Sequence, residues 1–317
     1  MTAGQTPDVA ARGGYLFAYF TGEHTADGEQ VRLALSEGAD PLHWRPLRGG
    51  DPVVVSTRGT LGLRDPFLVR GPDRFFLLAT DLRIFGSGDW DACQRHGSRA
   101  IMVWESPDLV RWGPQRSLVV APPDAGDAWA PKGYYDAARG EYRILFSCAL
   151  FPDGNRSGLI RHRTLAVRTR DLRTVSEPET YLDRDVIDVV LLTVGDQEHR
   201  FLAEDGFITQ EVSPAAGGAF QEVRRGIGRP EIARGEGPAV FGTPEGDRWF
   251  LFIDEFGGRG YVPFETSDPR SGAWTPSSSF QLPPGARHGS VLALTAEEHA
   301  RLSHEQITVP AGPSSGS

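Results

Sequence analysis

The stretch Leu63-Arg64-Asp65-Pro66-Phe67-Leu68-Val69 places one carboxylate, that of Asp65, at the start of an apolar run. Four later stretches have a similar build: 129–132 (Trp-Ala-Pro-Lys), 186–190 (Val-Ile-Asp-Val-Val), 236–240 (Glu-Gly-Pro-Ala-Val) and 287–291 (Arg-His-Gly-Ser-Val). Short apolar runs bounded by turn residues are typical of buried strands. We therefore predict five copies of one strand around a common axis, with their charged ends meeting in a single pocket.

A repeated turn supports the same count. A Ser/Thr-x-Asp or related turn, mostly followed by an aromatic residue, recurs near residues 36–44, 106–112, 169–172, 213–220 and 266–274, at spacings of about 45 to 70 residues. In each unit the opening strand is followed by a hairpin turn and further apolar runs. Four antiparallel strands per unit make a propeller blade. The sequence thus predicts an all-β, five-bladed β-propeller.

The two ends of the chain complete the fifth blade. Residues 287–295 form an opening strand with no full blade after it, and residues 15–44 form a blade with no opening strand before it. Joined together, they close the ring and leave no open edge between the first and last blades. We predict a single propeller domain over residues 13–302, with flexible polar termini at 1–12 and 303–317.

Composition narrows the class of protein. The 317 residues are 39% hydrophobic, which is enough for a large core, and the net charge of -9 argues against nucleic acid as a partner. The start of the chain has no signal-like apolar region, and no apolar run reaches the ~20 residues of a membrane span. Cys93 and Cys148 form neither a disulfide framework nor a metal motif. We expect a cytoplasmic monomer without a membrane partner, although a secreted chain trimmed at its N-terminus would look the same.

Three carboxylates, those of Asp65, Asp188 and Glu236, begin three different inner strands. Gathering like charges at a crowded axis is unfavourable, so a stabilising role is a poor explanation for them. Glycoside hydrolysis needs one acid to protonate the leaving oxygen and a second carboxylate to activate water or attack directly. A third can raise the pKa of the proton donor. The long segments 80–99 and 147–163 are expected to form walls around the pocket, on the propeller face where these acids lie.

Four motifs and one histidine, all in register, resemble glycoside hydrolase family 43. They are Arg64-Asp65-Pro66, Trp129-Ala130-Pro131, Ile187-Asp188, Glu236-Gly237-Pro238 and His288. This family consists of five-bladed propeller enzymes that remove arabinose, xylose or related sugars, and the resemblance covers about residues 15–302. It implies that Asp65 is the general base, Glu236 the general acid, and Asp188 the residue that raises the pKa of Glu236 and orients it. Inversion would place the carboxyls of Asp65 and Glu236 about 6.5–9.5 Å apart.

The resemblance implies an exo-acting, inverting glycosidase acting on an oligosaccharide or glycoside. A terminal α-L-arabinofuranosyl unit is the first expectation. A β-D-galactofuranosyl unit has nearly the same ring stereochemistry, and a β-D-xylosyl unit is the third choice. The alternative of another class is a carbohydrate-binding propeller without catalysis, which a missing acid would favour, but all three acids are present. The chemistry itself requires no cofactor.

Further residues are expected to bind substrate. Trp129 is predicted to form a wall of the sugar site, or else a contact between blades, and Trp90 to cover the site from its long loop. Arg259 is placed to bond sugar hydroxyls or a carboxylate, unless it is a plain surface residue. In related propellers the histidine that matches His288 can hold a calcium ion through water, so the resemblance also implies a structural calcium on the axis. A hydrogen-bonded structural role is the alternative for His288.

Lys132 departs from the pattern of the family, in which an acidic residue usually follows Trp-Ala-Pro. It is the only lysine of the chain. A cation there would lower the pKa of nearby carboxylates, and it could also contact a substrate hydroxyl or anionic group. We take Lys132 as a candidate determinant of sugar specificity, with neutral drift as the alternative.

Overall fold

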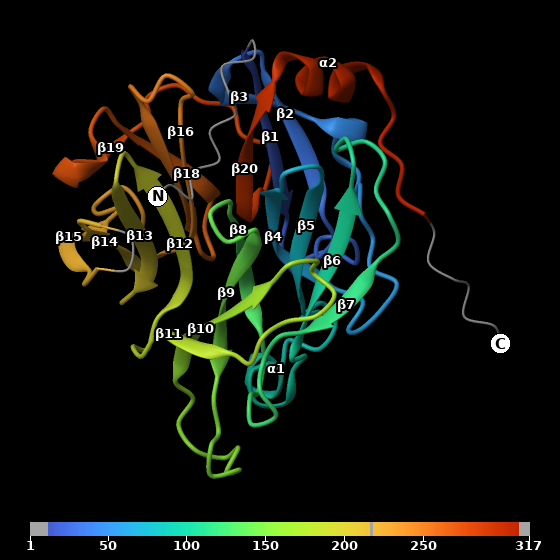
Figure 1. Cartoon of the computed structure of the whole chain (residues 1–317), viewed down its shortest axis with the longest axis vertical. Coiled ribbons are helices and arrows are strands. Elements are labelled where there is room, and N and C mark those ends of the chain that lie inside the picture. Colours follow the sequence, from blue (N-terminus) through green and yellow to red (C-terminus); the bar gives the residue numbers. More distant parts are fainter. Residues whose placement is uncertain (1–11, 216–217, 311–317) are drawn as a thin grey trace.

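The apolar runs form twenty strands in five antiparallel four-stranded sheets within residues 12–215 and 218–310, which are the residues that the computed structural model describes. The first strands of the five sheets contact one another in the order β4, β8, β12, β16, β20 and back to β4. This ring of inner strands is a five-bladed β-propeller (Figure 1), so the predicted fold is confirmed.

Four blades are built from consecutive strands. Blade 1 contains β4 (Leu63–Arg70), β5 (Phe75–Asp81), β6 (Ala100–Ser106) and β7 (Arg116–Val119). Blade 2 contains β8 (Trp129–Asp136), β9 (Glu141–Ala149), β10 (His162–Thr169) and β11 (Glu179–Leu182). Blade 3 contains β12 (Ile187–Val194), β13 (Gln197–Glu204), β14 (Phe207–Ser213) and β15 (Gln221–Ile227). Blade 4 contains β16 (Gly235–Gly242), β17 (Trp249–Glu255), β18 (Gly260–Thr266) and β19 (Thr275–Pro276).

Blade 5 joins the two ends of the chain. Its inner strand is β20 (Arg287–Thr295), followed by β1 (Arg12–Phe20), β2 (Arg32–Glu37) and β3 (Asp40–Pro46). In Figure 1 the red β20 lies beside the blue β1, and Leu16 pairs with Leu292 in an antiparallel register. The predicted closure is confirmed, and it completes the fifth four-stranded blade from the two ends of the chain.

Aromatic side chains fill the space between blades 4 and 5. Phe17 is fully buried, and its ring centroid lies 5.3 Å from that of Trp44, 6.0 Å from that of Phe252 and 5.8 Å from that of Tyr261. Pairs at such distances add to the free energy gained by burying the rings. Because Phe17 lies on β1, this packing holds the N-terminal strand against blade 4 as well as within blade 5.

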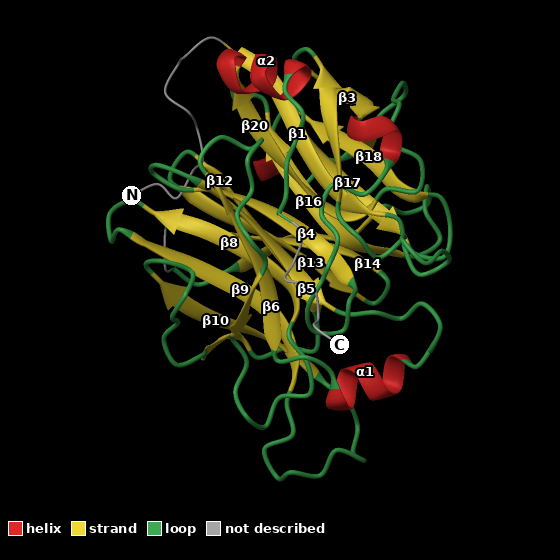
Figure 2. Ribbon diagram, turned by 90° about the vertical axis from the view of Figure 1, so that its right-hand side faces the viewer, coloured by secondary structure: helices red, strands yellow, loops and turns green. Residues whose placement is uncertain are grey.

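The connections between second and third strands carry the long segments, as expected from the strand directions. One contains helix α1 (Trp90–His96), and the other is the loop 150–161 between β9 and β10. Figure 2 shows α1 and long loops at one end of the molecule and α2 (Ala296–His304) at the other. Arg95 of α1 donates to the carbonyls of Arg156 and Gly158, 2.5 and 2.7 Å away, so the two long segments form one wall.

The remaining helices are short. They are η1 (Leu47–Gly50) and η2 (Pro269–Ser271), both single 3-10 turns. No helix within residues 12–215 and 218–310 is long and apolar enough to cross a membrane.

The expectation of a flexible tail from residue 303 is wrong for residues 303–310. Helix α2 continues to His304, and the following segment runs along blade 1, where Trp112 N–H donates to Thr308 O at 2.9 Å. Ile307 is buried in the core of this region. The sequence did not show this packing because its partners lie about 200 residues earlier in the chain. Residues 1–11 and 311–317, the rest of the predicted termini, lie outside the described residues.

Truncation of Phe17 should destabilise the whole propeller. We expect Phe17→Ala to lower the free energy of unfolding by about 3–5 kcal/mol, because it removes a fully buried ring and leaves a cavity. Urea unfolding followed by far-UV circular dichroism measures the change. Phe280→Ala, at an exposed phenylalanine, is the control and should change stability by less than about 0.5 kcal/mol. Equal effects of the two changes would contradict the closing role of β1.

Candidate active site

All five inner strands carry the same irregularity near their first residue. The pairing between each inner strand and the second strand of its blade shifts there. The residue that follows the last regular pair before the shift has a positive φ in every blade: Asp65 (51°), Ala130 (50°), Asp188 (59°), Gly237 (55°) and His288 (36°). Such bulges re-aim side chains, and positive φ is uncommon for residues other than glycine. The fold therefore directs Asp65, Asp188 and His288 toward the axis from equivalent positions of blades 1, 3 and 5.

Glu236 lies one position earlier in its strand than the two aspartates do in theirs. It matches Arg64, Trp129 and Arg287, which also precede a bulge. The residue that follows it is Gly237, and a Cβ there would lie 2.5 Å from Cγ of His288. Glycine is thus required at that bulge because the His288 ring occupies the space. The charged residues at the strand starts therefore occupy two adjacent positions. Glu236 stands directly before its bulge, and the aspartates stand one residue later in theirs.

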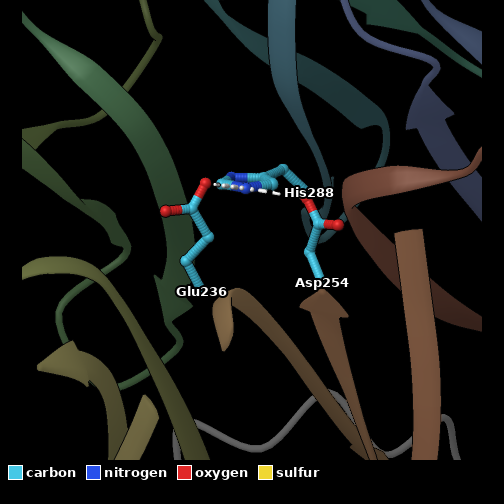
Figure 3. Close-up of side chains that lie close together, drawn as sticks. All are labelled: Glu236, Asp254 and His288. Carbon is cyan, nitrogen blue, oxygen red and sulfur yellow. Dashed lines mark hydrogen bonds and ion pairs between the residues drawn. The ribbon is translucent and has the colours of Figure 1, made fainter. Parts of the chain in front are cut away.

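His288 is the centre of the cluster. Its Nδ1 lies 3.1 Å from Asp65 Oδ1 and 3.8 Å from Asp188 Oδ2. Its Nε2 lies 3.0 Å from both Glu236 Oε1 and Asp254 Oδ2 (Figure 3). Burial alone would lower the pKa of His288, but hydrogen bonds to Asp254, Asp65 and Glu236 and the charge of Asp188 raise it well above its ordinary value. The imidazole therefore carries a positive charge.

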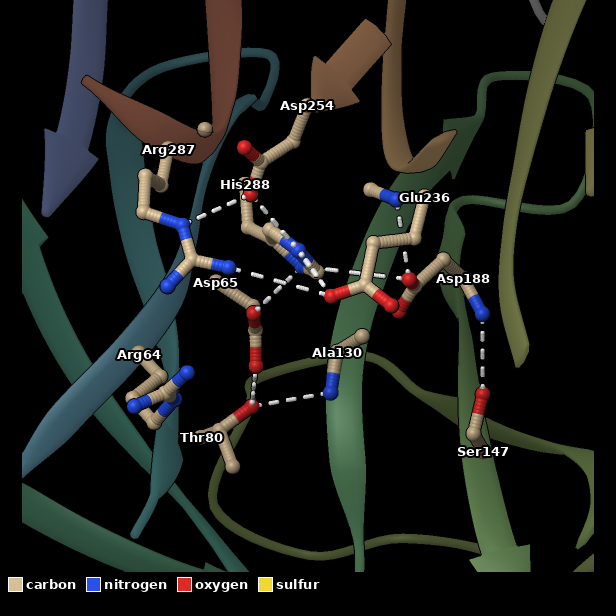
Figure 4. A network of polar contacts seen from close by, with 12 residues as sticks. Arg64, Asp65, Thr80, Ala130, Ser147, Asp188, Glu236, Asp254, Arg287 and His288 are labelled. Carbon is tan, nitrogen blue, oxygen red and sulfur yellow. Dashed lines mark hydrogen bonds and ion pairs between the residues drawn. The ribbon is translucent and has the colours of Figure 1, made fainter. Parts of the chain in front are cut away.

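Asp65 is held ionised. Its Oδ2 accepts a hydrogen bond of 2.6 Å from Thr80 Oγ1, which in turn accepts from Ala130 N–H at 2.8 Å (Figure 4). Burial would raise the pKa of Asp65, but the hydrogen bond and charge of His288, with smaller effects of Arg64 and Lys132, bring it well below its usual range. A carboxylate that stays charged and keeps lone pairs free can accept a proton from water.

Asp188 has the opposite character. Burial, opposed by His288 and reinforced by the charges of Asp65 and Glu236, raises the pKa of Asp188 to about 6. Its Oδ2 accepts a 3.0 Å hydrogen bond from Gly237 N–H, and its own N–H donates to Ser147 Oγ at 3.2 Å. Asp188 thus fixes the backbone immediately after Glu236.

Asp254 and Arg287 complete the cluster and were not among the predicted site residues. Asp254 is fully buried at the end of β17, and Arg287 Nε donates to its Oδ2 at 2.8 Å. Arg287 Nη2 lies 3.8 Å from Glu236 Oε1. The signal for Asp254 was present in the sequence, where an acid ends the apolar run Phe250-Leu251-Phe252-Ile253 at the same face as the other acids.

Lys132 lies in the interior beside the acids. Its side chain is buried, and Nζ is 5.3 Å from the centroid of the Phe67 ring. Burial lowers the pKa of Lys132 below its ordinary value, and the charges of Asp65 and Asp188 oppose this only in part. The structure therefore buries Lys132 near the cluster, where it senses the charges of Asp65 and Asp188.

Two predicted aromatic residues form a wall beside the cluster. The rings of Trp90 and Trp129 meet edge to face at 6.1 Å, and the Arg64 guanidinium carbon lies 4.9 Å from the Trp90 ring. Trp129 also packs on His162, whose Nε2 is 3.3 Å from buried Asp127. Burial, partly opposed by His162, raises the pKa of Asp127. Both tryptophans are half-buried and can offer ring faces to a sugar.

Arg259 is engaged elsewhere. Its Nε lies 2.7 Å from Glu255 Oε2, and its Nη2 donates to Glu231 O at 2.7 Å. Glu255 ends strand β17 and Glu231 lies in the connection between blades 3 and 4, so neither of these partners belongs to the carboxylate cluster. A role of Arg259 in sugar binding remains a prediction.

Within residues 12–215 and 218–310, donor atoms of Glu236, Asp254 and His288 lie within 4.8 Å of one another, so these three side chains could approach one metal ion. A calcium ion takes six to eight oxygen ligands and repels neighbouring cations. Both ring nitrogens of His288 already face carboxylates, which makes both of them donors, and Arg287 lies against Asp254. A protonated imidazole has no lone pair for a metal. In this arrangement the residues do not fit a calcium ion.

Comparison with known proteins assigns the chain to a family. Residues 11–300 match the model of a family 43-related domain described as a probable glycosyl hydrolase domain. The chain belongs to the family 43-related glycoside hydrolases. An α-L-arabinofuranosidase of Bifidobacterium longum subsp. longum is 29% identical over 219 residues, which span 63% of this chain and 20% of that protein. This family 43-related chain therefore corresponds to about a fifth of that relative's length.

Solved structures support the fold of this family 43-related domain. A thermostable family 43 glycoside hydrolase matches with a TM-score of 0.54 and 16% identity, covering 77% of this chain and 83% of that one. The catalytic domain of a Coprinopsis cinerea family 62 α-L-arabinofuranosidase matches with a TM-score of 0.51 and 14% identity, covering 73% and 72%. At these identities the likeness concerns the propeller alone.

His288 should remain protonated at pH 8. Its folded-state pKa is raised above the unfolded value of about 6.5, so its contacts stabilise the fold fully below that pH and lose this effect only as pH rises through the higher folded value. The ¹⁵N shifts of the ring measure its state, and His288→Gln assigns the signal. The same histidine in the urea-unfolded chain is the reference. Loss of the ring proton below pH 7 in the folded protein would contradict the described contacts.

Proposed function

We propose that the protein is an inverting, exo-acting glycoside hydrolase that releases a terminal furanosyl sugar, with α-L-arabinofuranosides as its first substrates. Asp65 is the general base, Glu236 the general acid, and Asp188 the residue that orients the acid and keeps it protonated. The observation that supports this most strongly is that Asp65 and Glu236 face opposite edges of one imidazole ring.

The spacing of the two acids supports this assignment. Because both contact the small ring of His288, the Asp65 and Glu236 oxygens nearest to it are at most about 8 Å apart, which is close enough for two carboxyl groups to act on one glycosidic bond. Wider spacing would have argued against the pair.

The electrostatics also suit these roles. The contact with His288 lowers the pKa of Asp65, and Thr80 also donates a hydrogen bond to it. The carboxylate of Asp65 is therefore ionised at neutral pH, as a general base must be. The charge of Glu236 contributes to the raised pKa of Asp188, so the two neighbouring acids are electrostatically coupled. Trp90 and Trp129 supply apolar faces for the sugar ring, and Lys132 remains our candidate for sugar specificity. The B. longum α-L-arabinofuranosidase supports the choice of sugar.

The two acids can be distinguished by the leaving group of the substrate. A 4-nitrophenoxide leaves with little protonation, so Glu236→Gln should retain more activity on 4-nitrophenyl α-L-arabinofuranoside than on an arabino-oligosaccharide. Asp65→Asn should lose activity on both by a factor of about 10²–10⁴, because water activation is needed in either case. Initial rates give the comparison.

Glu231→Gln, at an exposed carboxylate, is the control for both changes and should leave the rates unchanged. The corresponding β-D-galactofuranoside and β-D-xyloside test the choice of sugar. A folded wild-type protein that hydrolyses none of the three would overturn the proposal and favour a sugar-binding propeller.

Replacing Lys132 should change how kcat/KM depends on pH on the acidic side, or acid limb, of the profile. The carboxylate of Asp188 must be ionised to repel Glu236, so kcat/KM should rise with pH through a value of about 6. Removing a cation destabilises nearby carboxylates and raises their pKa, so Lys132→Met should move this limb to higher pH by about one unit. A pH profile of kcat/KM checks the shift. An unchanged limb, or one moved to lower pH, would contradict the described position of Lys132.

A further inference from the structure

The layer directly beneath the carboxylate cluster bears on the ion that the resemblance implies. It consists of the first paired residue after each bulge: Phe67, Lys132, Val190, Ala239 and Ser290. In this layer only Ser290 has a side-chain oxygen, and that oxygen accepts a hydrogen bond from Leu68 N–H at 2.8 Å. Below it is an axial cavity of about 450 Å³ with a largely apolar lining that includes Val190, Ala239 and Val291. The layer offers no oxygen cage for a hard cation.

The layer above does not suit a water-mediated ion either. A water bound to calcium points its hydrogens away from the metal, so a ring nitrogen that faces it must accept a hydrogen bond. In His288 both nitrogens face carboxylate oxygens, at 3.0–3.1 Å, and therefore donate. The ring already fills the position between Asp65, Glu236 and Asp254 (Figures 3 and 4).

Buried carboxylates still need a compensating charge. Lys132 is only 2% exposed and belongs to the layer that follows the bulges of Asp65 and Asp188, where its charge lowers the pKa of both acids. Arg287 lies against Asp254, and His288 contacts the acids from the centre. The chain has no other lysine, and the position after Trp129-Ala130-Pro131 is where the family usually has an acid.

We propose that Lys132 and His288 together take the place of the axial calcium ion, so that the site is charge-balanced by the chain itself and binds no divalent cation. In this view Lys132 acts as a built-in counter-ion whose Nζ stabilises Asp65 and Asp188 from below. The proposal concerns the ion requirement of the site that we assign to glycoside hydrolysis. It is tested by stability, so its failure and failure of the proposed activity can be told apart.

The first test uses the wild-type chain. After dialysis against EDTA, addition of millimolar calcium should change the midpoint of thermal unfolding by less than about 1 °C, whereas a well-occupied site would raise it by about 5 °C or more. Terbium, as a luminescent calcium substitute, should show no saturable binding at micromolar concentration. A calcium-dependent midpoint, or saturable terbium emission that Asp254→Asn abolishes, would overturn the proposal.

The second test reverses the charge at Lys132. Lys132→Glu restores the acidic residue usual in the family and removes the counter-ion, so its unfolding midpoint should fall and then recover by several degrees with calcium. Lys132→Gln, which is neutral and adds an amide oxygen, is the second variant if the glutamate does not fold, and it should respond in the same direction. Arg45→Glu, at an exposed arginine of β3, is the matched control and should stay independent of calcium. If neither Lys132 variant responds to calcium, Lys132 does not substitute for the ion.

Discussion

The contact of one imidazole with four carboxylates determines the arrangement of the site. Because the His288 ring occupies the axis, the neighbouring bulge must be glycine, and Gly237 lies where any Cβ would collide with the ring. Tyr261 secures the same region: its hydroxyl donates to Gly237 O at 2.8 Å and accepts from Gly289 N–H at 2.6 Å, joining the bulges of blades 4 and 5. Placement of the acid Glu236 thus depends on a histidine 52 positions later in the chain.

The propeller makes this contact possible by repeating one backbone irregularity. Each inner strand carries a bulge near its start, so equivalent positions of all five blades approach the axis. Closure by β1 and β20 matters for the same reason, because the blade that carries His288 is complete only when both ends of the chain pair. A propeller can hold a crowded ring of charges there since the strands behind it are closely packed and paired in antiparallel sheets.

Two aspartates at equivalent positions acquire different chemistry from their surroundings. Asp65 receives hydrogen bonds from Thr80 and His288 and has a lowered pKa, whereas the longer 3.8 Å contact of Asp188 with His288 does not offset burial, and its pKa is raised. Environment thus separates a carboxylate that remains charged from one that titrates near neutrality. The same electrostatics explain why cations are buried beside these acids, since unpaired charges in the interior are costly.

The sequence by itself determined the number of blades, the closure by the two ends and the acids Asp65, Asp188 and Glu236. These follow from local signals, because an apolar run after a charged residue and a turn at a regular place can be recognised within about ten residues. Only the tertiary structure decided that Glu236 precedes its bulge, that Asp254 and Arg287 join the cluster, and that residues 303–310 pack on blade 1. It also buried Lys132 in the layer of inner-strand residues that follows the bulges. These features arise where side chains from different blades meet, and distance along the chain carries no information about which ones do.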